Sequence, residues 1–597
     1  MARDHIDLTR SAAVQEFTER SDALSGPDAD RNKGRWKHIE RILLGKLRTT
    51  AASLAVVTLV IWTAFVIMRV PLLSHFQKIA GDTMDGILAL AIEMHWYHVF
   101  NGSAIGWRTA GYFFPIRDTL GYNDGFFLNG TLLALFRACG VDAFLGLQLV
   151  DWCFRAIGFV SMWTLARRCF RWPLLVNGLA ATLFVTANCY YSHDALHAQF
   201  LACNWLPLLI LLQIESWRAA AGATVRRFFG FAVAFAALLG AILITAFYVA
   251  FFFILADSLA LAILVLLEYL TTPFPVLLTV RRYIRFAAVQ IFLLLVCCLP
   301  FLMIYLPKAA ETGMHPLSDA LQYAMRPTDV INVGPSNLLW SYFYGRTLWH
   351  LFPNWAGSFE NQTGATPILF ALFLLGGFFL RSTRTSEWRQ ATLFAMWCAN
   401  LLLLVAAIHW PHWGWPWAWI YRLVPGAPAV RVVSRIQLVL LIPTILIACD
   451  VIARGWRRTD MRAVFVLLAC LLLIEQINNA PVFDIDRPAE NAFFASVDHV
   501  PPECRAFFAE NSRPGPDFQS LYRHNVDSMI LAELSGTPTL NGFATFLPPH
   551  WNLVHPEQPQ YLAAVRDWLA RHPARGPVCG VNFQTGAWTV LPNVAVK

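Results

Sequence analysis

Charged residues are scarce in this chain of 597 residues: Asp, Glu, Lys and Arg make up 14% of it, whereas an average soluble protein has about 25%. A soluble protein of this length with so few charged residues could not cover its surface with them. Long uncharged runs are present instead, and 57% of the residues are hydrophobic. These figures exclude a cytosolic enzyme, a secreted disulfide scaffold and a disordered chain. They predict a polytopic membrane protein.

Cysteine is infrequent as well, with 12 residues. Most of them lie in the apolar runs, where a cysteine usually acts as a small apolar residue. Cys504 and Cys579 instead lie in the polar C-terminal part. An oxidising compartment would let them pair. Their spacing in the sequence does not decide between a disulfide and two free thiols.

The uncharged runs predict about eleven helical spans between residues 50 and 477. The segment 1–49 precedes them; it carries ten Lys and Arg residues and lacks the apolar core of a signal peptide. Arginine clusters recur at alternate connections, as the positive-inside rule requires if residues 1–49 are cytoplasmic. The net charge of +8 is therefore interpreted as a topology signal and not as a sign of nucleic-acid binding. Two points stay open: whether 125–139 only skims the membrane, and how 228–267 divides into two spans.

Three segments on the opposite side of the membrane are too long to be simple connections. We name them the first loop (71–142), the second loop (307–365) and the tail (478–597). The tail contains short alternating runs such as Val578–Val590, which are typical of strands. We therefore predict an α-helical membrane domain followed by a small mixed α/β domain outside the cytoplasm.

The first loop holds four aspartates near the predicted membrane surface: Asp82, Asp85, Asp118 and Asp124. A partly desolvated carboxylate can act as a general base or bind a divalent cation. Asp82 and Asp85 are three residues apart, so one helical turn would place both on one side. The alternative is that Asp82 caps the helix that follows and Asp85 lies in its first turn.

Two histidines lie between the third and fourth predicted spans. His193 and His197 are four residues apart, so a helix would bring them together as a metal pair. No Glu follows His193 directly, so the zinc-protease pattern is absent. The alternative is that both are polar residues at the rim of a cavity.

The second loop and the connection before the tenth predicted span supply further polar residues. Glu360 lies just before the eighth span, and Arg431 and Arg435 lie just before the tenth. This arginine pair is on the non-cytoplasmic side, against the charge rule. On a helix the two guanidinium groups would share a face suited to a phosphate. An interfacial anchor, or an ion pair with an acid of the first loop, is the alternative.

The order of these pieces resembles the GT-C superfamily of membrane glycosyltransferases. The matching motifs are Gly81-Asp82 after the first span, an aromatic-Pro turn at Phe114-Pro115, the His197-Ala198-Gln199 triplet, Glu360, and the block Pro425–Arg435. The resemblance covers residues 50–450 as an architecture. It is closest to bacterial members with a C-terminal periplasmic domain. It implies an inner-membrane protein with a cytoplasmic N-terminus and a periplasmic C-terminus.

The resemblance also implies a reaction. Such enzymes transfer a sugar from a polyprenyl-phosphate donor to an acceptor hydroxyl of a glycan, lipid or protein, usually with inversion. Their base is an acid of the first loop, here Asp82 or, as the alternative, Asp85. Arg431 and Arg435 would hold the donor phosphate. Other substrate-binding candidates are Asp118, Asp124, His193, His197, Gln199 and Glu360. Some relatives use a divalent cation (Mg²⁺ or Mn²⁺), for which Asp82, Asp85 and Glu360 are candidates.

Two other functions fit the same composition. The first is a transporter or flippase of lipid-linked sugars or lipids. The second is a non-catalytic assembly factor for envelope polysaccharide. Transporters usually place charged residues inside the spans. Here Arg155, Asp257 and Glu268 are the main candidates, with Glu268 at the end of a span, whereas the acids of the loops collect on one face of the membrane, as chemistry on that face requires.

Overall fold

The structure, a computed structural model, describes residues 52–222, 224–271, 276–344, 359–382, 388–458, 461–514, 517–574 and 576–591, with positions 50, 347 and 350. The predicted cytoplasmic segment 1–49 lies outside these residues. The chain divides into two compact units, Met1–Ile61 and Trp62–Lys597. The described part of the first unit is the beginning of one apolar helix, Ala52–Leu73. The second unit contains the remaining helices, the loops and the tail.

The protein is a multi-pass, mostly helical membrane protein. Nine helices of the described part are long and apolar enough to cross a membrane. Shorter apolar helices occupy the eighth and eleventh predicted positions, so each predicted span corresponds to a helix. After Ala52–Leu73, these helices are α5 (Ala143–Leu165), α6 (Leu174–Val185), α8 (Leu206–Ala221), α9 (Val225–Thr245), α10 (Phe247–Thr271), α11 (Val276–Thr312), α15 (Pro367–Ser382), α16 (Trp388–Ala407), α18 (Ile436–Trp456) and α19 (Arg462–Ile474).

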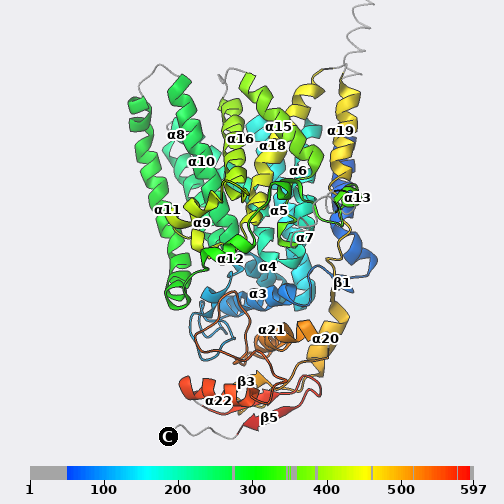
Figure 1. The fold of residues 1–597 in the computed structure, drawn as a ribbon, viewed down its shortest axis with the longest axis vertical. Helices are drawn as coiled ribbons and strands as arrows, with labels where there is room; N and C mark the ends of the chain where they lie inside the picture. Colours follow the sequence, from blue (N-terminus) through cyan, green and yellow to red (C-terminus); the bar gives the residue numbers. More distant parts are fainter. Residues whose placement is uncertain are drawn as a thin grey trace, which may run out of the picture. The chain divides into compact units, whose positions relative to one another are not determined.

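Two open points about the spans are settled by helix boundaries. The run 228–267 divides at Ala246, whose extended backbone (φ −154°, ψ 96°) separates α9 from α10. The segment 125–139 forms α4 (Phe127–Ala138), which has 12 residues. That is shorter than the roughly 20 residues of a spanning helix. It packs beside α3 (Asp85–Asn101), at the tail side of the bundle (Figure 1).

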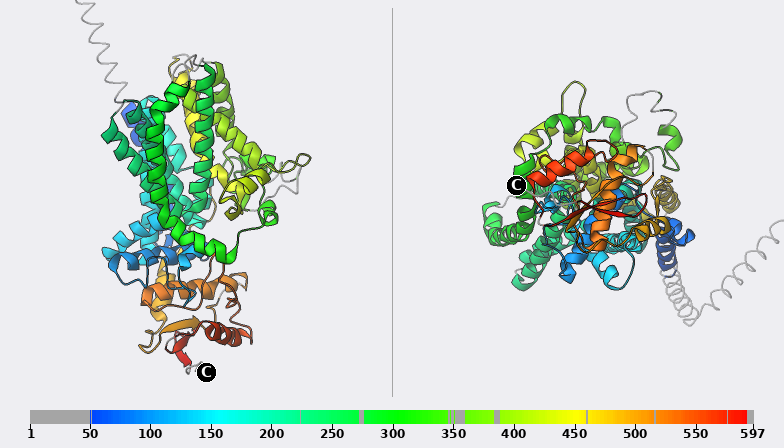
Figure 2. Two further views of the ribbon diagram at one scale, coloured as in Figure 1. Left: turned by 90° about the vertical axis from the view of Figure 1, so that its left-hand side faces the viewer. Right: turned by 90° about the horizontal axis from the view of Figure 1, so that it is seen from below.

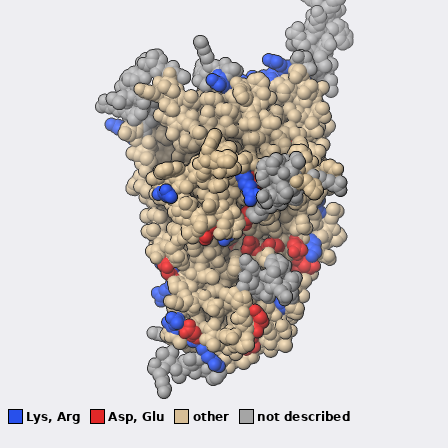
Figure 3. All heavy atoms as spheres, in the orientation of Figure 1, with Lys and Arg blue, Asp and Glu red and all other residues tan. Residues whose placement is uncertain are grey.

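The centre of the bundle is α18, which is buried by α6, α10, α15 and α16. The close approach of α15 to α18 depends on a small residue. A Cβ atom on Gly376 of α15 would lie 2.4 Å from a side-chain carbon of Ile447 in α18. On the face drawn in Figure 3, the described acidic side chains gather in the half that holds the tail, and the broad apolar part above shows none. This distribution agrees with a membrane-embedded bundle.

The tail is a small mixed α/β region, as predicted. Its sheet has the order β3 (Ala506–Ala509), β4 (Val578–Val581), β5 (Trp588–Leu591), with β3 parallel and β5 antiparallel to β4. Its helices are α20 (Arg487–Ser496), α21 (Asp517–Ser535) and α22 (Tyr561–Arg571). Cys504 and Cys579 form a disulfide with a Cα–Cα distance of 5.7 Å, which decides the pairing left open by the sequence.

The tail packs directly on the first loop, and Figure 2 shows both at one end of the bundle. The strand β1 (Lys78–Ile79) pairs antiparallel with β2 (Ile485–Asp486). A separate parallel bridge joins Gly81 to Phe483: the Gly81 N–H donates to the Val482 carbonyl at 3.0 Å, and the Gly81 carbonyl accepts from the Asp484 N–H at 3.0 Å. The backbone that leads into Asp82 is therefore held by the tail.

Candidate functional site

Four ionisable side chains from distant parts of the chain meet at the tail side of the bundle. We name Asp85, His197, Glu360 and Arg435 the ion cluster. His197 Nδ1 lies 3.2 Å from Asp85 Oδ2, and its Nε2 lies 3.7 Å from Glu360 Oε1. Arg435 donates from Nη2 to Glu360 Oε2 at 2.6 Å, and the same Nη2 lies 3.1 Å from His197 Nε2. The first loop, the second loop and two helix junctions thus converge on one point.

Asp82 lies at the entrance to α3, three residues before Asp85. Gly81 has φ 118°, a conformation that favours glycine, and turns the chain from the β1 pairing into the helix. Asp82 Oδ1 accepts from the N–H groups of Met84 at 3.1 Å and Gly86 at 2.9 Å. Asp85 lies in the first turn of α3, as the capping alternative predicts, but the N-cap position is Met84, and Asp82 reaches the first turn from two residues before it. Asp82 Oδ2 has no hydrogen bond among the described residues.

Burial raises the pKa of Asp82 above its usual value, and the nearby charge of Asp85 adds to this effect, against the hydrogen bonds from Gly86 and Met84. A carboxylate with a raised pKa is a stronger proton acceptor. Each aspartate keeps one carboxylate oxygen without a hydrogen bond among the described residues, because Asp85 uses only Oδ2 for His197 and Asp82 uses only Oδ1 for the backbone. The two differ in that Asp82 is fixed by two backbone N–H groups.

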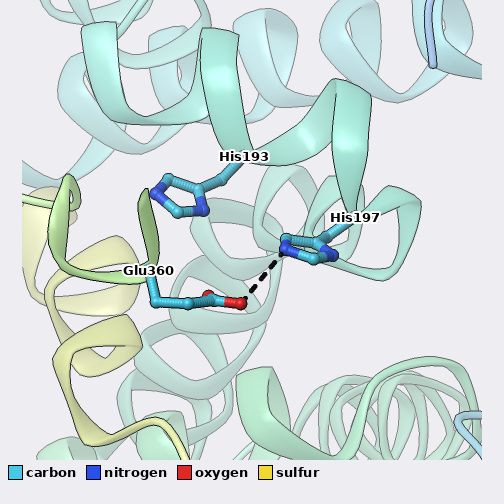
Figure 4. A group of neighbouring side chains, drawn as sticks. All are labelled: His193, His197 and Glu360. Atoms are coloured by element: carbon cyan, nitrogen blue, oxygen red, sulfur yellow. Dashed lines mark ion pairs between the residues drawn. The ribbon is translucent and has the colours of Figure 1, made fainter. Parts of the chain in front are cut away.

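The two histidines are neighbours at the C-terminal end of one helix. The helix α7 (Asn188–Leu196) ends one residue before His197, whose backbone (φ −130°, ψ 78°) starts the 3-10 helix η3 (Ala198–Trp205). His197 is the C-cap of α7, and its N–H donates to the His193 carbonyl at 2.8 Å, so the i, i+4 relation expected for the pair is kept at the end of the helix. The rings stack, with centroids 6.2 Å apart and planes inclined by 19° (Figure 4).

The arginine pair also departs from the helical prediction. The chain reaches Arg435 through the short 3-10 helices η8 (Ala427–Ala429) and η9 (Val433–Arg435), and α18 begins only at Ile436. The two side chains consequently have different surroundings. The guanidinium of Arg431 lies over the Tyr323 ring at 5.1 Å. That of Arg435 lies over Phe200 at 4.9 Å and pairs with Glu360, not with an acid of the first loop.

The ion cluster holds Glu360 ionised. Burial raises the pKa of Glu360, but the charges of Arg435 and His197 outweigh burial and leave that pKa far below its usual value. Burial and Arg435 lower the pKa of His197, whereas its bonds to Asp85 and Glu360 raise it; the net result is a raised pKa. Since the carboxylates flank His197 on both sides, they stabilise its protonated form.

The other predicted site residues divide into near and distant ones. Asp124 accepts from the Phe247 N–H at 2.8 Å; burial raises its pKa to about 6, against that bond and the charge of Arg435. It therefore lies near the cluster. Asp118 instead forms an ion pair with Arg108 of the same loop, at 3.3 Å. Gln199 lies in η3, and its side chain makes no hydrogen bond to the cluster among the described residues.

Three of these side chains have the composition of a metal site. His193, His197 and Glu360 each offer one donor atom, and these atoms lie within 4.8 Å of one another. His193 is fully buried, and neither ring nitrogen has a well-formed hydrogen bond among the described residues, although the Gln362 backbone lies nearby. The group could bind a metal. Of the three predicted metal ligands, Glu360 belongs to it, whereas Asp82 and Asp85 do not.

The sequence did not indicate the aromatic residues of the site. Tyr248 presents its ring to Arg435 at 5.7 Å and accepts from the Arg431 N–H through its hydroxyl at 2.7 Å. With Phe200 it forms aromatic walls around Arg435. No sequence pattern separates these rings from the other aromatics of the spans, because only tertiary packing brings them to the cluster.

Comparison with known proteins gives a likeness of fold. No protein-family model matches the sequence, and no curated protein matches it. Among solved structures, the apo oligosaccharyltransferase of Archaeoglobus fulgidus is similar at 11% identity and a TM-score of 0.47, over 88% of this chain and 69% of that one. ArnT of Cupriavidus metallidurans bound to undecaprenyl phosphate is similar at 13% identity and a TM-score of 0.36, over 89% and 93%.

The mycobacterial arabinofuranosyltransferase AftD is similar at 13% identity and a TM-score of 0.46, over 84% of this chain and 32% of that one. The chain thus spans about a third of the length of AftD. All three similarities are found at low sequence identity. With identities of 11–13% this likeness concerns the arrangement of the helices, and the activity has to follow from the site.

Proposed function

We propose that the protein is a membrane glycosyltransferase that acts on the outer face of the cytoplasmic membrane. It moves a sugar from a polyprenyl-phosphate donor to an acceptor hydroxyl, with inversion at the anomeric carbon. The observation that carries this proposal is the position of Asp82: a carboxylate with a raised pKa and an unengaged oxygen, beside the ion cluster, at the tail side of an apolar bundle.

The proposed reaction is a single displacement. The acceptor oxygen attacks the anomeric carbon while its proton passes to Asp82 Oδ2. The bond between that carbon and the phosphate oxygen breaks, and the polyprenyl phosphate leaves with the electron pair. The departing polyprenyl phosphate is a phosphate monoester, which is already a good leaving group, so one base is enough, unlike the two carboxylates of hydrolases. Attack opposite the leaving group inverts the configuration.

Arg431 is the proposed partner of the leaving phosphate. It forms no ion pair with a carboxylate among the described residues, whereas the charge of Arg435 is balanced by Glu360. The Tyr323 ring below the Arg431 guanidinium holds it in place. A cation fixed where negative charge develops lowers the barrier of the reaction. The two arginines, predicted to act as a pair, would thus have separate roles.

The test is sugar transfer by the purified full chain in nanodiscs, with a set of radiolabelled polyprenyl-phosphate sugars and membrane extracts as acceptors. Asp82→Asn should reduce transfer by about 10²–10⁴-fold, the usual contribution of a general base. Asp567→Asn, at an exposed ion pair of the tail, is the matched control and should keep the activity. Full transfer by Asp82→Asn would exclude Asp82 as the base.

A translocation assay of the same variants in proteoliposomes, which have an enclosed compartment, separates transfer from transport. Arg155 forms a 2.9 Å ion pair with Asp151 inside α5 and donates to the Val185 carbonyl, and Asp257 accepts from Gln213 at 2.7 Å. These bonds give both groups a structural role. A transporter would lose lipid-linked sugar translocation in Asp257→Asn while no transfer occurs in any variant, and that result would contradict the proposed function.

A further inference from the structure

The composition of the His193, His197 and Glu360 group invites a metal ion, but the geometry around it does not fit one. Ligands at the 2.0–2.2 Å of a tetrahedral zinc are roughly 3.4 Å apart. Here one pair of donor atoms is 3.7 Å apart, and the donors as a set lie within 4.8 Å. The group is therefore wider than a loaded site, and closing it would require the side chains to move inward.

Arg435 stands in the way of that movement. Its Nε and Nη2 both donate to Glu360 Oε2, at 3.0 Å and 2.6 Å, and Nη2 faces His197 Nε2 at 3.1 Å. A metal would have to displace these hydrogen bonds of Glu360 and the proton of His197. A metal ion at this point would also be repelled by the guanidinium of Arg435, because an arginine side chain does not lose its proton in a protein.

Arg435 is itself built in as a permanent part of the site. Its side chain is 10% exposed. Its guanidinium lies over Phe200 at 4.9 Å and over Tyr248 at 5.7 Å, an arrangement that stabilises a cation. Glu360, held ionised, supplies the counter-charge. The site thus has the acidic and imidazole partners of a metal centre with a guanidinium bound among them.

We propose that Arg435 is the resident cation of this site and takes the place of a divalent metal, so that the protein binds no metal at His193, His197 and Glu360. The guanidinium supplies positive charge and directed N–H donors, but no exchangeable coordination position. This inference rests on the proposed function only for the location of the site. It predicts a metal-independent protein whose metal site is latent and becomes available when Arg435 is removed.

The test measures metal content and needs no substrate. The purified full chain and its variants are incubated with Zn²⁺ or Mn²⁺, desalted, and analysed by mass spectrometry for metal per chain. Wild-type protein and Arg435→Lys should retain no ion at the cluster. Arg435→Ala should gain close to one ion per chain, because Glu360 loses its guanidinium partner and the competing positive charge beside His193 and His197 is removed. The double variant Arg435→Ala/His197→Ala should lose that ion, which separates it from ions held by surface histidines.

Arg435→Gln serves as a second variant, because it keeps a planar hydrogen-bonding group and guards against misfolding of Arg435→Ala. Two results would overturn the proposal. One is a stoichiometric ion in the wild-type protein that is lost on His193→Ala/His197→Ala. The other is equal metal content in the wild type and both neutral Arg435 variants. Since these measurements need no donor or acceptor, their outcome is distinguishable from a failure of the glycosyltransferase proposal.

Discussion

Glu360 Oε2 accepts two hydrogen bonds from one guanidinium, at 3.0 Å from Arg435 Nε and 2.6 Å from Arg435 Nη2. The carboxylate belongs to the second loop and the arginine to the entrance of α18. One buried pair therefore joins the loop to the central helix of the bundle, next to the residues proposed for the reaction.

Removing one partner of this pair should destabilise the protein. Glu360→Gln leaves the Arg435 charge buried without its counter-ion, and breaking a buried pair in this way costs about 3–5 kcal/mol. Thermal unfolding in detergent should show a clear fall in midpoint. Glu360→Leu/Arg435→Met removes both charges and should recover most of the loss. A double variant less stable than either single one would contradict a paired role.

The acid limb of the pH–rate profile should report on Asp82. Its raised pKa means that activity is lost on acidification at a higher pH than an ordinary aspartate would give. Asp85→Asn removes the neighbouring negative charge that contributes to the raised pKa. The limb should therefore move to lower pH in that variant, whatever happens to the maximum rate. A limb that stays in place would assign it to another group, with Asp124 as the first candidate.

Arg431 should affect the donor and not the acceptor. Arg431→Ala should lower kcat by about 10²–10³-fold, because charge stabilisation at the departing oxygen is lost, and it should weaken inhibition by polyprenyl phosphate. Arg431→Lys should restore part of the rate, since it returns the charge but not the planar fork. Arg422→Ala, at an exposed arginine of α17 (Trp417–Leu423), is the matched control and should bind polyprenyl phosphate normally.

Glu93 gives a pH-dependent stability that can be measured without any substrate. Its side chain is fully buried in α3, and burial raises its pKa to about 8, against a bond from Asn129. Between its ordinary value and about pH 8 the folded state keeps a proton that the unfolded state has lost. Stability therefore falls as pH rises through this range.

Glu93→Gln should remove part of that fall in thermal unfolding scans from pH 5 to pH 8. A remainder should persist, because burial also raises the pKa of Glu533 to about 8, against a bond from Gly111. Glu557→Gln, at a carboxylate with a 58% exposed side chain, should follow the wild-type protein. An unchanged slope in Glu93→Gln would mean that Glu93 does not carry this proton.

The disulfide should matter for the tail alone. Cys504 and Cys579 close a loop over a sequence separation of 75, for which loop-closure entropy corresponds to about 4 kcal/mol. Cys504→Ser should make the tail sensitive to limited proteolysis while the bundle stays resistant. Cys139→Ser, at an exposed free thiol beside α4, should have no such effect. Uniform proteolysis of both parts would show that the tail does not unfold on its own.

The sequence predicted the membrane helices well, because a span must be long and apolar whatever its neighbours are. It also indicated Asp82, Asp85, His197, Glu360 and Arg435. It could not give their pairing. Glu360 and Arg435 are 75 residues apart, and the short 3-10 turns before α18 defeat the helical spacing assumed for the arginines. Local periodicity carries no information about such long-range contacts.

The strand β1, which leads into Asp82, has its hydrogen-bonding partner in β2 of the tail. About 400 residues of synthesis separate the two, which corresponds to roughly 20–80 s at 5–20 residues per second. Throughout that time the nascent bundle exposes Gly81 and Asp82 without the backbone that fixes them. Nascent chains without the tail should therefore show no sugar-transfer activity even when the bundle is inserted in the membrane. Activity should appear only as synthesis of the tail nears its end.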